Sequence, residues 1–105
     1  MSDYPVQGEI IRINGASAPF LVISQDYFNA SGLIVVCPIA KSAAPDALHV
    51  PIEIPAVQGY ALCENITTVS AASRGYSRIG SIDSSCLLEI IYRVQSIFDY
   101  FHHAE

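Results

Sequence analysis

The sequence is poor in charge, and above all in positive charge. Of its 105 residues only 14% are Asp, Glu, Lys or Arg, and ten acidic residues face five basic ones, which gives a formal net charge of −5. General coating of nucleic acid is driven by clustered Lys and Arg and is therefore excluded, but a small basic groove built from a few arginines is not. So sparsely charged a surface also favours oligomerisation, because apolar area left outside the core needs a partner.

Cysteine pairs with the spacing of a metal or redox site are also missing. Cys37, Cys63 and Cys86 are each embedded in apolar sequence, no CxxC occurs, and the three histidines form no ligand pattern with them. We expect buried free thiols in a reducing cytoplasm rather than disulfides or a metal site. We therefore predict a cytoplasmic protein that uses no metal and no cofactor.

Long apolar runs are absent as well. No stretch approaches the ~20 residues that cross a bilayer. The polar start MSDYPVQGE lacks the apolar core of a signal peptide. No linker, repeat or low-complexity segment divides the chain. With 51% hydrophobic residues the sequence has material for a full core. It predicts one domain over residues 1–105, with no membrane association.

Short β-rich segments fill the first four fifths of the chain. We expect strands at residues 7–13, 20–24, 33–37, 48–54, 60–69 and 79–82. Turns are expected at Asn14-Gly15 and at 55–59, one helical turn at 26–29, and a small polar link at 70–77. The run 33–37 shows no alternation, which indicates burial on both faces. Pro38 limits the pairing of its strand to an edge or a bulge.

From Asp83 the period of the sequence changes to that of a helix. Apolar residues recur at steps of three and four: Leu87, Ile90, Ile91, Val94, Ile97, Phe98 and Phe101. Asp83 can accept the free N–H groups of the first turn. Strands followed by a single helix predict a mainly β fold. We expect a strongly bent sheet or small barrel with the C-terminal helix packed against it.

One carboxylate interrupts an otherwise apolar expected strand. Glu64 lies within residues 60–69, with Asn65 beside it. A buried charge is costly unless it is paired or faces a groove. Glu64 is therefore the first candidate for a functional group. The structural alternative is a carboxylate at the barrel rim that pairs with Arg74 or Arg78.

Several short strings occur in an order that resembles the MazF/PemK toxins of type II toxin–antitoxin modules, a group that includes Kid-like toxins and shares its fold with CcdB. The match runs without an internal gap over nearly the whole chain and ends in the helix from Asp83. The strings are Gly8-Glu9-Ile10-Ile11, Pro19-Phe20-Leu21-Val22-Ile23-Ser24, Val36-Cys37-Pro38-Ile39, Ala61-Leu62-Cys63-Glu64-Asn65-Ile66, Ser73-Arg74-Gly75 and Ile79-Gly80.

The resemblance implies an SH3-like β-barrel that forms a homodimer and binds a cognate antitoxin. It also implies a metal-independent endoribonuclease, an mRNA interferase that cuts single-stranded RNA. In that reaction the 2′-hydroxyl attacks the adjacent phosphate and leaves a cyclic phosphate and a 5′-hydroxyl. The chemistry needs a base, an acid and a cation or donor for the charge on phosphorus.

Roles for particular residues follow from the resemblance. Glu64 takes the place of the base or orienting carboxylate. Lys41 takes that of the phosphate-facing cation, as a point charge without the bidentate fork of an arginine, and Ser42 follows it in the catalytic loop. The residues expected to contact RNA are Asn65, Arg74, Arg78 and Ser17.

The sequence also departs from the family pattern. Ala18 stands where relatives have an arginine before the proline, Ala40 replaces a threonine, and Leu62 replaces the arginine two positions before the acidic residue. The loop after the first strand is shortened to Asn14-Gly15-Ala16-Ser17. The scaffold therefore matches the family better than the active site does.

These departures keep a second hypothesis open, from a different class. The chain would then be a non-catalytic binding protein on the same scaffold. It would grip a protein target, as CcdB-type toxins grip gyrase, or only bind its antitoxin. Each site residue has a structural alternative too. Lys41 would be a solvated loop lysine, Arg74 and Arg78 surface charges, Arg12 structural, and His49 an exposed strand histidine rather than an acid–base group.

Overall fold

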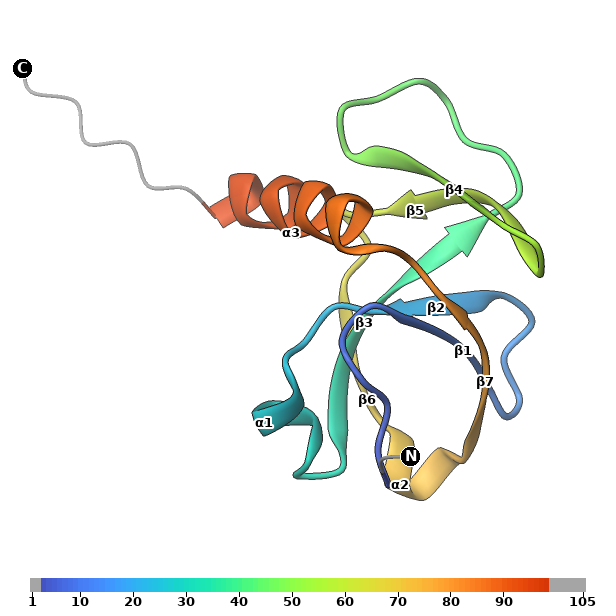
Figure 1. The fold of residues 1–105 in the computed structure, drawn as a ribbon, viewed down its shortest axis with the longest axis vertical. Helices are drawn as coiled ribbons and strands as arrows, with labels where there is room; N and C mark the ends of the chain where they lie inside the picture. Colours follow the sequence, from blue (N-terminus) through green and yellow to red (C-terminus); the bar gives the residue numbers. More distant parts are fainter. Residues whose placement is uncertain (1–2, 99–105) are drawn as a thin grey trace, which may run out of the picture.

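The computed structural model describes residues 3–98, and its elements confirm a mainly β fold that ends in a helix (Figure 1). A sheet of seven short strands is followed by one long helix. The elements in chain order are β1 (Glu9–Ile13), β2 (Pro19–Val22), α1 (Asp26–Asn29), β3 (Leu33–Ala40), β4 (His49–Ile54), β5 (Val57–Leu62), β6 (Thr67–Ser70), α2 (Ala71–Arg74), β7 (Tyr76–Ser81) and α3 (Ser84–Phe98).

Strand β3 is the centre of the sheet. One edge pairs with β2, while the other edge pairs first with β6, at residues 33–36, and then with β5, at residues 39 and 40. Pro38 falls between these two partners, so its missing N–H removes no bond on that edge. Pro38 is thus accommodated where β3 changes its partner from β6 to β5, and β3 does not need to be an edge strand.

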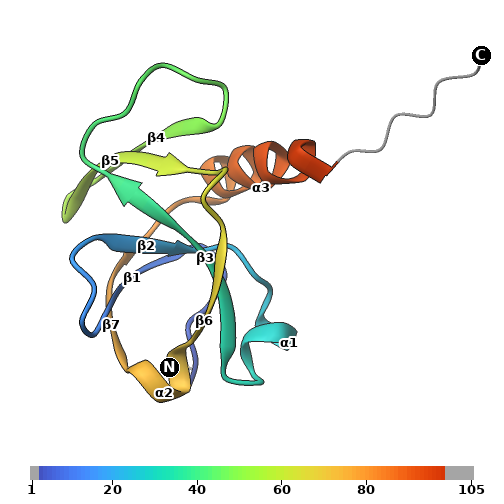
Figure 2. The ribbon, with the colours of Figure 1, turned by 180° about the vertical axis from the view of Figure 1, so that it is seen from behind.

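The strand order is β4-β5-β3-β2-β1-β7, and β6 adds to β3 from the side. Figures 1 and 2 show β1, β2, β3, β6 and β7 curling around one another, while the β4–β5 hairpin extends beyond them with α3 beside it. The ladder between β1 and β7 is irregular between Ile10 and Ile11. Such bulges increase the local twist and help a sheet to curl.

The sheet buries apolar side chains on both faces, which confirms the expected burial for Ile34, Val36 and Cys37, whereas Leu33 at the start of the run is 43% exposed. Successive residues of a strand point to opposite faces, so Leu21 and Val22 enter different cores. Ile10 and Cys37 join Leu21 in the larger core, which also includes Ile90 of α3. The smaller core, with Ile34 and Val36, fills the curl of the sheet. Full burial of an aliphatic side chain stabilises the fold by roughly 1.5–3 kcal/mol.

The expected strand over residues 60–69 is wrong, because the chain turns in its middle. β5 ends at Leu62, residues 63 and 64 form a turn, and β6 begins at Thr67. The turn is needed because β5 pairs with the end of β3 and β6 with its beginning. Glu64 therefore lies in an exposed turn and not inside a buried strand.

Two other expected boundaries move as well. The turn predicted at residues 55–59 is only Pro55 and Ala56, because Val57 already pairs with Ile54. The link predicted at 70–77 contains the short helix α2, and β7 starts at Tyr76 instead of at Ile79.

Helix α3 begins as its sequence predicts. The Asp83 carboxylate accepts a hydrogen bond of 2.8 Å from the N–H of Cys86, which is the expected cap. Ile90 is fully buried against the sheet. The last expected helix residue, Phe101, lies outside the described residues, as do His102 and His103. No helix within residues 3–98 is long and apolar enough to cross a membrane.

One buried amide ties the N-terminal segment to the sheet. Asn29 is fully buried and donates from Nδ2 to the carbonyl oxygens of Pro5, at 2.8 Å, and Ser24, at 3.0 Å. Its Oδ1 accepts a hydrogen bond from the Ser24 hydroxyl, which in turn accepts one from the N–H of Val35 at 2.9 Å. The amide thus joins α1, β3 and the segment before β1.

We expect Asn29→Ala to lower the free energy of unfolding by about 2 kcal/mol, because it strands two buried carbonyl groups and a hydroxyl. Asn29→Asp keeps the acceptor oxygen and loses both donors, so it should destabilise as well. Urea unfolding measures both, and Asn65→Ala in the exposed turn is the matched control with little expected effect. A loss below about 0.5 kcal/mol for Asn29→Ala would contradict this assignment.

Candidate functional site

A basic hollow of about 540 Å³ opens at one end of the sheet. It brings together Ser17 and Lys41, two residues singled out from the sequence, and adds Arg12. No acidic side chain lines it. The lining residues are Arg12, Ser17, Pro19, Ile39, Lys41, Ala56, Val57 and Gln58.

Strand register explains why these residues meet. Arg12 lies opposite Pro19 in the β1–β2 ladder, and Ser17 belongs to the short loop between those strands. Ala40, the last residue of β3, pairs with Tyr60 of β5, and Lys41 directly follows it. The β4–β5 turn supplies Ala56. The hollow is therefore enclosed by segments from four strands that lie far apart in the sequence.

Gly59 is required beside Lys41. A Cβ at position 59 would lie 2.3 Å from the carbonyl oxygen of Ala40, closer than real contacts allow. The absence of a side chain lets β5 approach the end of β3, and this approach fixes where Lys41 leaves the sheet. Lys41 and Gln58 also line an adjoining hollow of about 340 Å³, together with Tyr60 and Glu53.

The five basic residues differ in whether their side chains form hydrogen bonds or ion pairs. Arg78 forms an ion pair with Glu9, with Nε 2.9 Å from Oε2, and Arg93 forms one with Glu89, with Nε 3.0 Å from Oε2. Arg74 donates from Nη2 to the carbonyl oxygen of Asn14 at 3.2 Å. Within residues 3–98, the side chains of Arg12 and Lys41 have no hydrogen bond and no ion pair.

Arg78 and Arg74 have structural partners. Besides Glu9, Arg78 donates to the carbonyl oxygen of Tyr4 at 2.8 Å and lies 5.4 Å from the centre of the Tyr76 ring. These contacts hold the N-terminal segment against β7. Arg74 holds the β1–β2 turn, whose next residues lead to Ser17.

Glu64 is paired with a histidine and not with Arg74 or Arg78. Its Oε2 lies 2.9 Å from Nε2 of His49, and Nδ1 of His49 lies 2.6 Å from the carbonyl oxygen of Ala44. Both ring nitrogens thus meet acceptors, whereas a neutral imidazole has a single N–H to donate. The Ala44 carbonyl first and the Glu64 carboxylate second raise the pKa of His49 above 6.5.

The structure separates Glu64 from the basic hollow. If the antiparallel register of β3 and β5 is continued by one residue, Lys41 faces Gly59. Glu64 lies beyond the other end of β5, after Leu62. Leu62 is three residues along the strand from Gly59, a distance of ~10 Å, and the turn adds to it. Ser42 and Asn65 are exposed, and neither lines the basic hollow.

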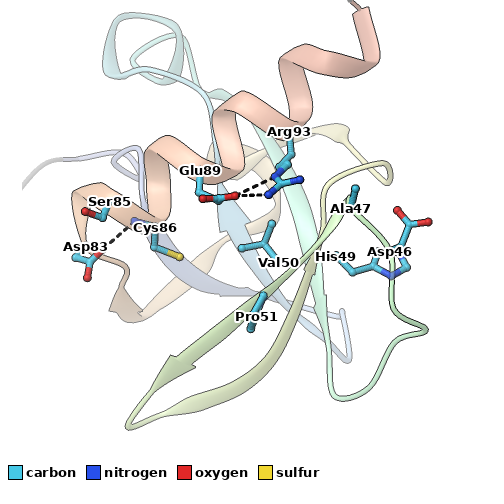
Figure 3. Close-up of a pocket in the computed structure, with 10 residues that line it drawn as sticks. All are labelled: Asp46, Ala47, His49, Val50, Pro51, Asp83, Ser85, Cys86, Glu89 and Arg93. Atoms are coloured by element: carbon cyan, nitrogen blue, oxygen red, sulfur yellow. Dashed lines mark hydrogen bonds and ion pairs between the residues drawn. The ribbon is translucent and has the colours of Figure 1, made fainter.

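Another hollow, of about 520 Å³, lies between α3 and β4 with the residues just before it (Figure 3). Its lining includes three carboxylates, from Asp46, Asp83 and Glu89. The one arginine there, Arg93, is already paired with Glu89, as the dashed lines in Figure 3 show. This acidic hollow repels a phosphate, although its volume is similar to that of the basic hollow.

The cysteines are unsuited to chemistry, and the described residues group no metal ligands. Burial raises the pKa of Cys37 to about 12 and that of Cys63 to about 11, which confirms the expected buried free thiols at these two positions. Cys86 is half-buried. Within residues 3–98 no three His, Cys, Asp or Glu side chains come together as candidate metal ligands.

Arg12 was not predicted to be a functional residue, because a charged residue in a strand usually indicates a surface position. A signal was nevertheless present. Arg12 lies between Ile11 and Ile13, which are buried in the smaller core, so alternation places its side chain on the opposite face from theirs. The hollow itself was not predictable, because the β4–β5 turn reaches it from far along the chain.

Comparison with known proteins agrees with this architecture. Residues 5–98 match the family described as PemK-like, MazF-like toxin of type II toxin–antitoxin system. Among solved structures, the MazE–MazF complex from Deinococcus radiodurans is similar, with a TM-score of 0.84, 23% identity, and coverage of 92% of this chain and 97% of that one. The comparison with curated protein sequences gives no match.

Two mycobacterial structures show the same fold at lower identity. An endoribonuclease in complex with its cognate antitoxin from a mycobacterial species has a TM-score of 0.79 and 17% identity, with coverage of 90% and 94% of the two chains. The Mycobacterium tuberculosis toxin MazF-mt6 has a TM-score of 0.74 and 18% identity, with coverage of 88% and 99%. These likenesses confirm the barrel with its C-terminal helix.

We expect Glu64→Gln to lower the pKa of His49, because it removes the carboxylate that accepts from Nε2. Asp46→Asn is the matched control and should change this pKa less, since Asp46 is the weakest of the groups that raise it. Titration of the His49 ring protons by NMR, assigned with His49→Gln, measures both. An unchanged pKa in Glu64→Gln would show that the pair does not form in solution.

The same pair makes stability depend on pH. Because the folded-state pKa of His49 is raised, its contribution to the free energy of unfolding is complete below pH 6.5 and is lost as the pH rises through the folded-state value. The difference in urea midpoint between the parent protein and His49→Gln should therefore shrink with rising pH. A difference that grows with pH would contradict this sign.

Proposed function

We propose that the protein is a toxin that cuts single-stranded RNA without a metal ion. The premise is that the chain belongs to the PemK-like, MazF-like toxins of type II toxin–antitoxin systems. The observation that carries the proposal is the basic hollow. It holds Lys41 and Ser17 together and has no carboxylate in its lining, in a chain whose net charge is −5. Of the hollows described above, this one suits an anionic ligand best.

The proposed reaction is an internal transfer at phosphorus. The 2′-oxygen of a ribose forms a bond to the adjacent phosphorus, the bond to the 5′-oxygen breaks, and the products are a cyclic phosphate and a 5′-hydroxyl. One proton leaves the 2′-hydroxyl and one is added to the 5′-oxygen. Lys41 would stabilise the extra negative charge on the phosphoryl oxygens, and Ser17 would hold the chain nearby.

Lys41 alone does not complete such a site. The base for the 2′-hydroxyl must lie within about 3 Å of it or act through one water. Glu64 remains the proposed base, with His49 holding its carboxylate, but it lies at the other end of β5. We therefore expect stabilisation of charge in the basic hollow to contribute more to the rate than Glu64 does.

The partners proposed for the chain are a second copy of itself and a cognate antitoxin, in the cytoplasm. The apolar side chains left exposed on α3 support a protein partner there, because they cover no described core. Leu88 is 65% exposed and Tyr92 is 71% exposed, one helical turn apart on the same face, and Phe98 is 66% exposed. We propose that this face of α3 forms the homodimer contact.

A non-catalytic binding protein is the second candidate, and one observation favours it. Glu64 is engaged by His49 away from Lys41, while Ala18, Ala40 and Leu62 offer no replacement for the side chains expected at a catalytic site. On this hypothesis the protein acts by binding a protein target or its antitoxin. An RNA cleavage assay in EDTA separates the two functions.

We expect the purified protein to cut a mixed-sequence single-stranded RNA in EDTA, and Lys41→Ala to lose on the order of 10²-fold in rate. Glu64→Gln should lose less than about 10-fold, because its carboxylate lies away from the basic hollow. Gel analysis of end-labelled RNA, with the cyclic phosphate identified by acid treatment, measures both rates.

The outcomes separate the hypotheses. Intact RNA after hours at micromolar protein would sink the ribonuclease proposal and leave the binding protein. A loss of 10²-fold or more in Glu64→Gln would mark Glu64 as the base, as the sequence predicted. Glu53→Gln, beside Lys41 in the adjoining hollow, is the control for a neutralised carboxylate near the basic hollow.

We expect Leu88→Glu and Tyr92→Glu to convert a homodimer into monomers, since each places a charge in the middle of the proposed contact. Tyr27→Glu is the matched control, because Tyr27 is 82% exposed on α1, outside this face. Sedimentation velocity measures the oligomeric state. Dimers that persist in both α3 variants would show that the contact lies on another surface.

A further inference from the structure

We propose that Arg12 and Lys41 together form a seat for a phosphate group of single-stranded RNA, with Tyr60 as a platform for an adjacent base. The seat deepens the proposed ribonuclease function and rests on it for the identity of the ligand. It adds Arg12 and Tyr60 to the residues that the sequence suggested.

The basic side chains that have no polar partner lie at this hollow. All five lie within the described residues, and three of them are bound: Arg78 to Glu9, Arg93 to Glu89, and Arg74 to a carbonyl group. The two whose side chains have no polar partner, Arg12 and Lys41, both line the basic hollow. A chain with ten acidic residues has ample carboxylates to pair them, yet none lies in this lining.

Two unpaired cations at one hollow repel each other, and a bound anion removes that repulsion. Arg12 lies in β1 and Lys41 directly follows the last residue of β3, so the pairing of the strands brings them together. A guanidinium can hold two phosphate oxygens at once, and an ammonium supplies a point charge from the other side. The hydroxyl of Ser17 and the amide of Gln58 add neutral donors to the same lining.

The size and walls of the hollow suit a nucleotide unit. Its volume of about 540 Å³ falls within the range of roughly 300–1,000 Å³ that is usual for small-ligand sites. Pro19, Ile39 and Val57 give it apolar walls. Polar donors in apolar surroundings bind an anion more strongly than the same donors in open water.

Tyr60 extends the site beyond the phosphate. Lys41 and Gln58 line both the basic hollow and the adjoining hollow that contains Tyr60 and Glu53, so the two hollows share a wall. Gln58 and Tyr60 are two residues apart in β5 and therefore face the same side. An aromatic ring beside a phosphate seat can stack an unpaired base, which favours a single strand over a duplex.

The acidic hollow provides an internal control. It has nearly the same volume and also contains an arginine, but three carboxylates line it and Arg93 is paired (Figure 3). Arg93→Ala removes the same charge from the chain as Arg12→Ala, at a site where no phosphate is expected. Any effect of net charge alone should therefore be equal in the two variants.

The test is binding of a fluorescent single-stranded RNA of about ten nucleotides in which every ribose is 2′-O-methylated, so that cleavage is blocked. Fluorescence anisotropy in EDTA at about 50 mM salt gives the Kd. We expect Arg12→Ala and Lys41→Ala each to weaken binding on the order of 10-fold, and Arg93→Ala less than about 2-fold. Arg12→Lys should recover part of the loss, and Tyr60→Phe should bind like the parent while Tyr60→Ala does not.

Salt dependence adds a readout that a structural role would not change. Each lost phosphate contact should reduce the slope of log K against log salt concentration by about 0.7. The seat would be overturned if Arg12→Ala had the same affinity and the same salt dependence as Arg93→Ala. It would also be overturned if the parent protein did not bind the RNA. Far-UV circular dichroism confirms that each variant is folded.

Cleavage of the unmodified RNA by the same proteins separates this inference from the proposed function. Binding through Arg12 without any cleavage would refute the ribonuclease and retain the phosphate seat. Cleavage by the parent protein that Arg12→Ala leaves unchanged would retain the ribonuclease and refute the seat. Loss of both binding and cleavage in Arg12→Ala, but not in Arg93→Ala, is the result expected if both are right.

Discussion

The double pairing of β3 is the constraint on which the rest of the structure depends. Both edges of this strand are bonded, and from Ile34 onward side chains on both of its faces enter a core. One edge must serve two partners in succession, and Pro38 lies where they change. Since β6 and β5 are successive in the chain, a turn has to separate them, and Glu64 is exposed in that turn. At its other end β3 delivers Lys41 to the basic hollow, beside the glycine that allows β5 to approach.

Scarcity of charge makes the few charged contacts informative. Glu9 and Arg78 join β1 to β7, where the ladder is irregular, and Glu89 and Arg93 stabilise one turn of α3. The exposed Glu89–Arg93 pair contributes only about 0–1 kcal/mol, whereas the Glu9–Arg78 pair is partly buried. Their main consequence here is to leave Arg12 and Lys41 as the cations without a partner in the described part of the chain. Were the surface rich in carboxylates near these two, the same residues would indicate nothing about a ligand.

Local signals in the sequence were sufficient for most of the elements, but not for the turn at Glu64 or for the site. The cap at Asp83 and the period of α3 are properties of neighbouring residues, and both were predictable. The two-sided burial within the run 33–37 was also readable from its lack of alternation. The turn at Glu64 was not, because residues 63–66 contain neither Gly nor Pro and the break is imposed by β3. The partner of Glu64 was missed for a related reason, since His49 comes from β4 and reaches it only through the hairpin.

The separation of Lys41 from Glu64 limits what the site can do. A base acts over hydrogen-bond distance, whereas a cation also stabilises charge from farther away in a hollow with apolar walls. About 10 Å of strand and a turn lie between the backbone positions of the two residues, so Glu64 does not lie beside the cations of the basic hollow. A carboxylate held by an imidazole whose pKa is raised serves well to fasten the segment around Ala44 to the hairpin. The acidic position Glu64 thus has a partner in His49, while the basic hollow holds Arg12 and Lys41, whose side chains have no polar partner within residues 3–98.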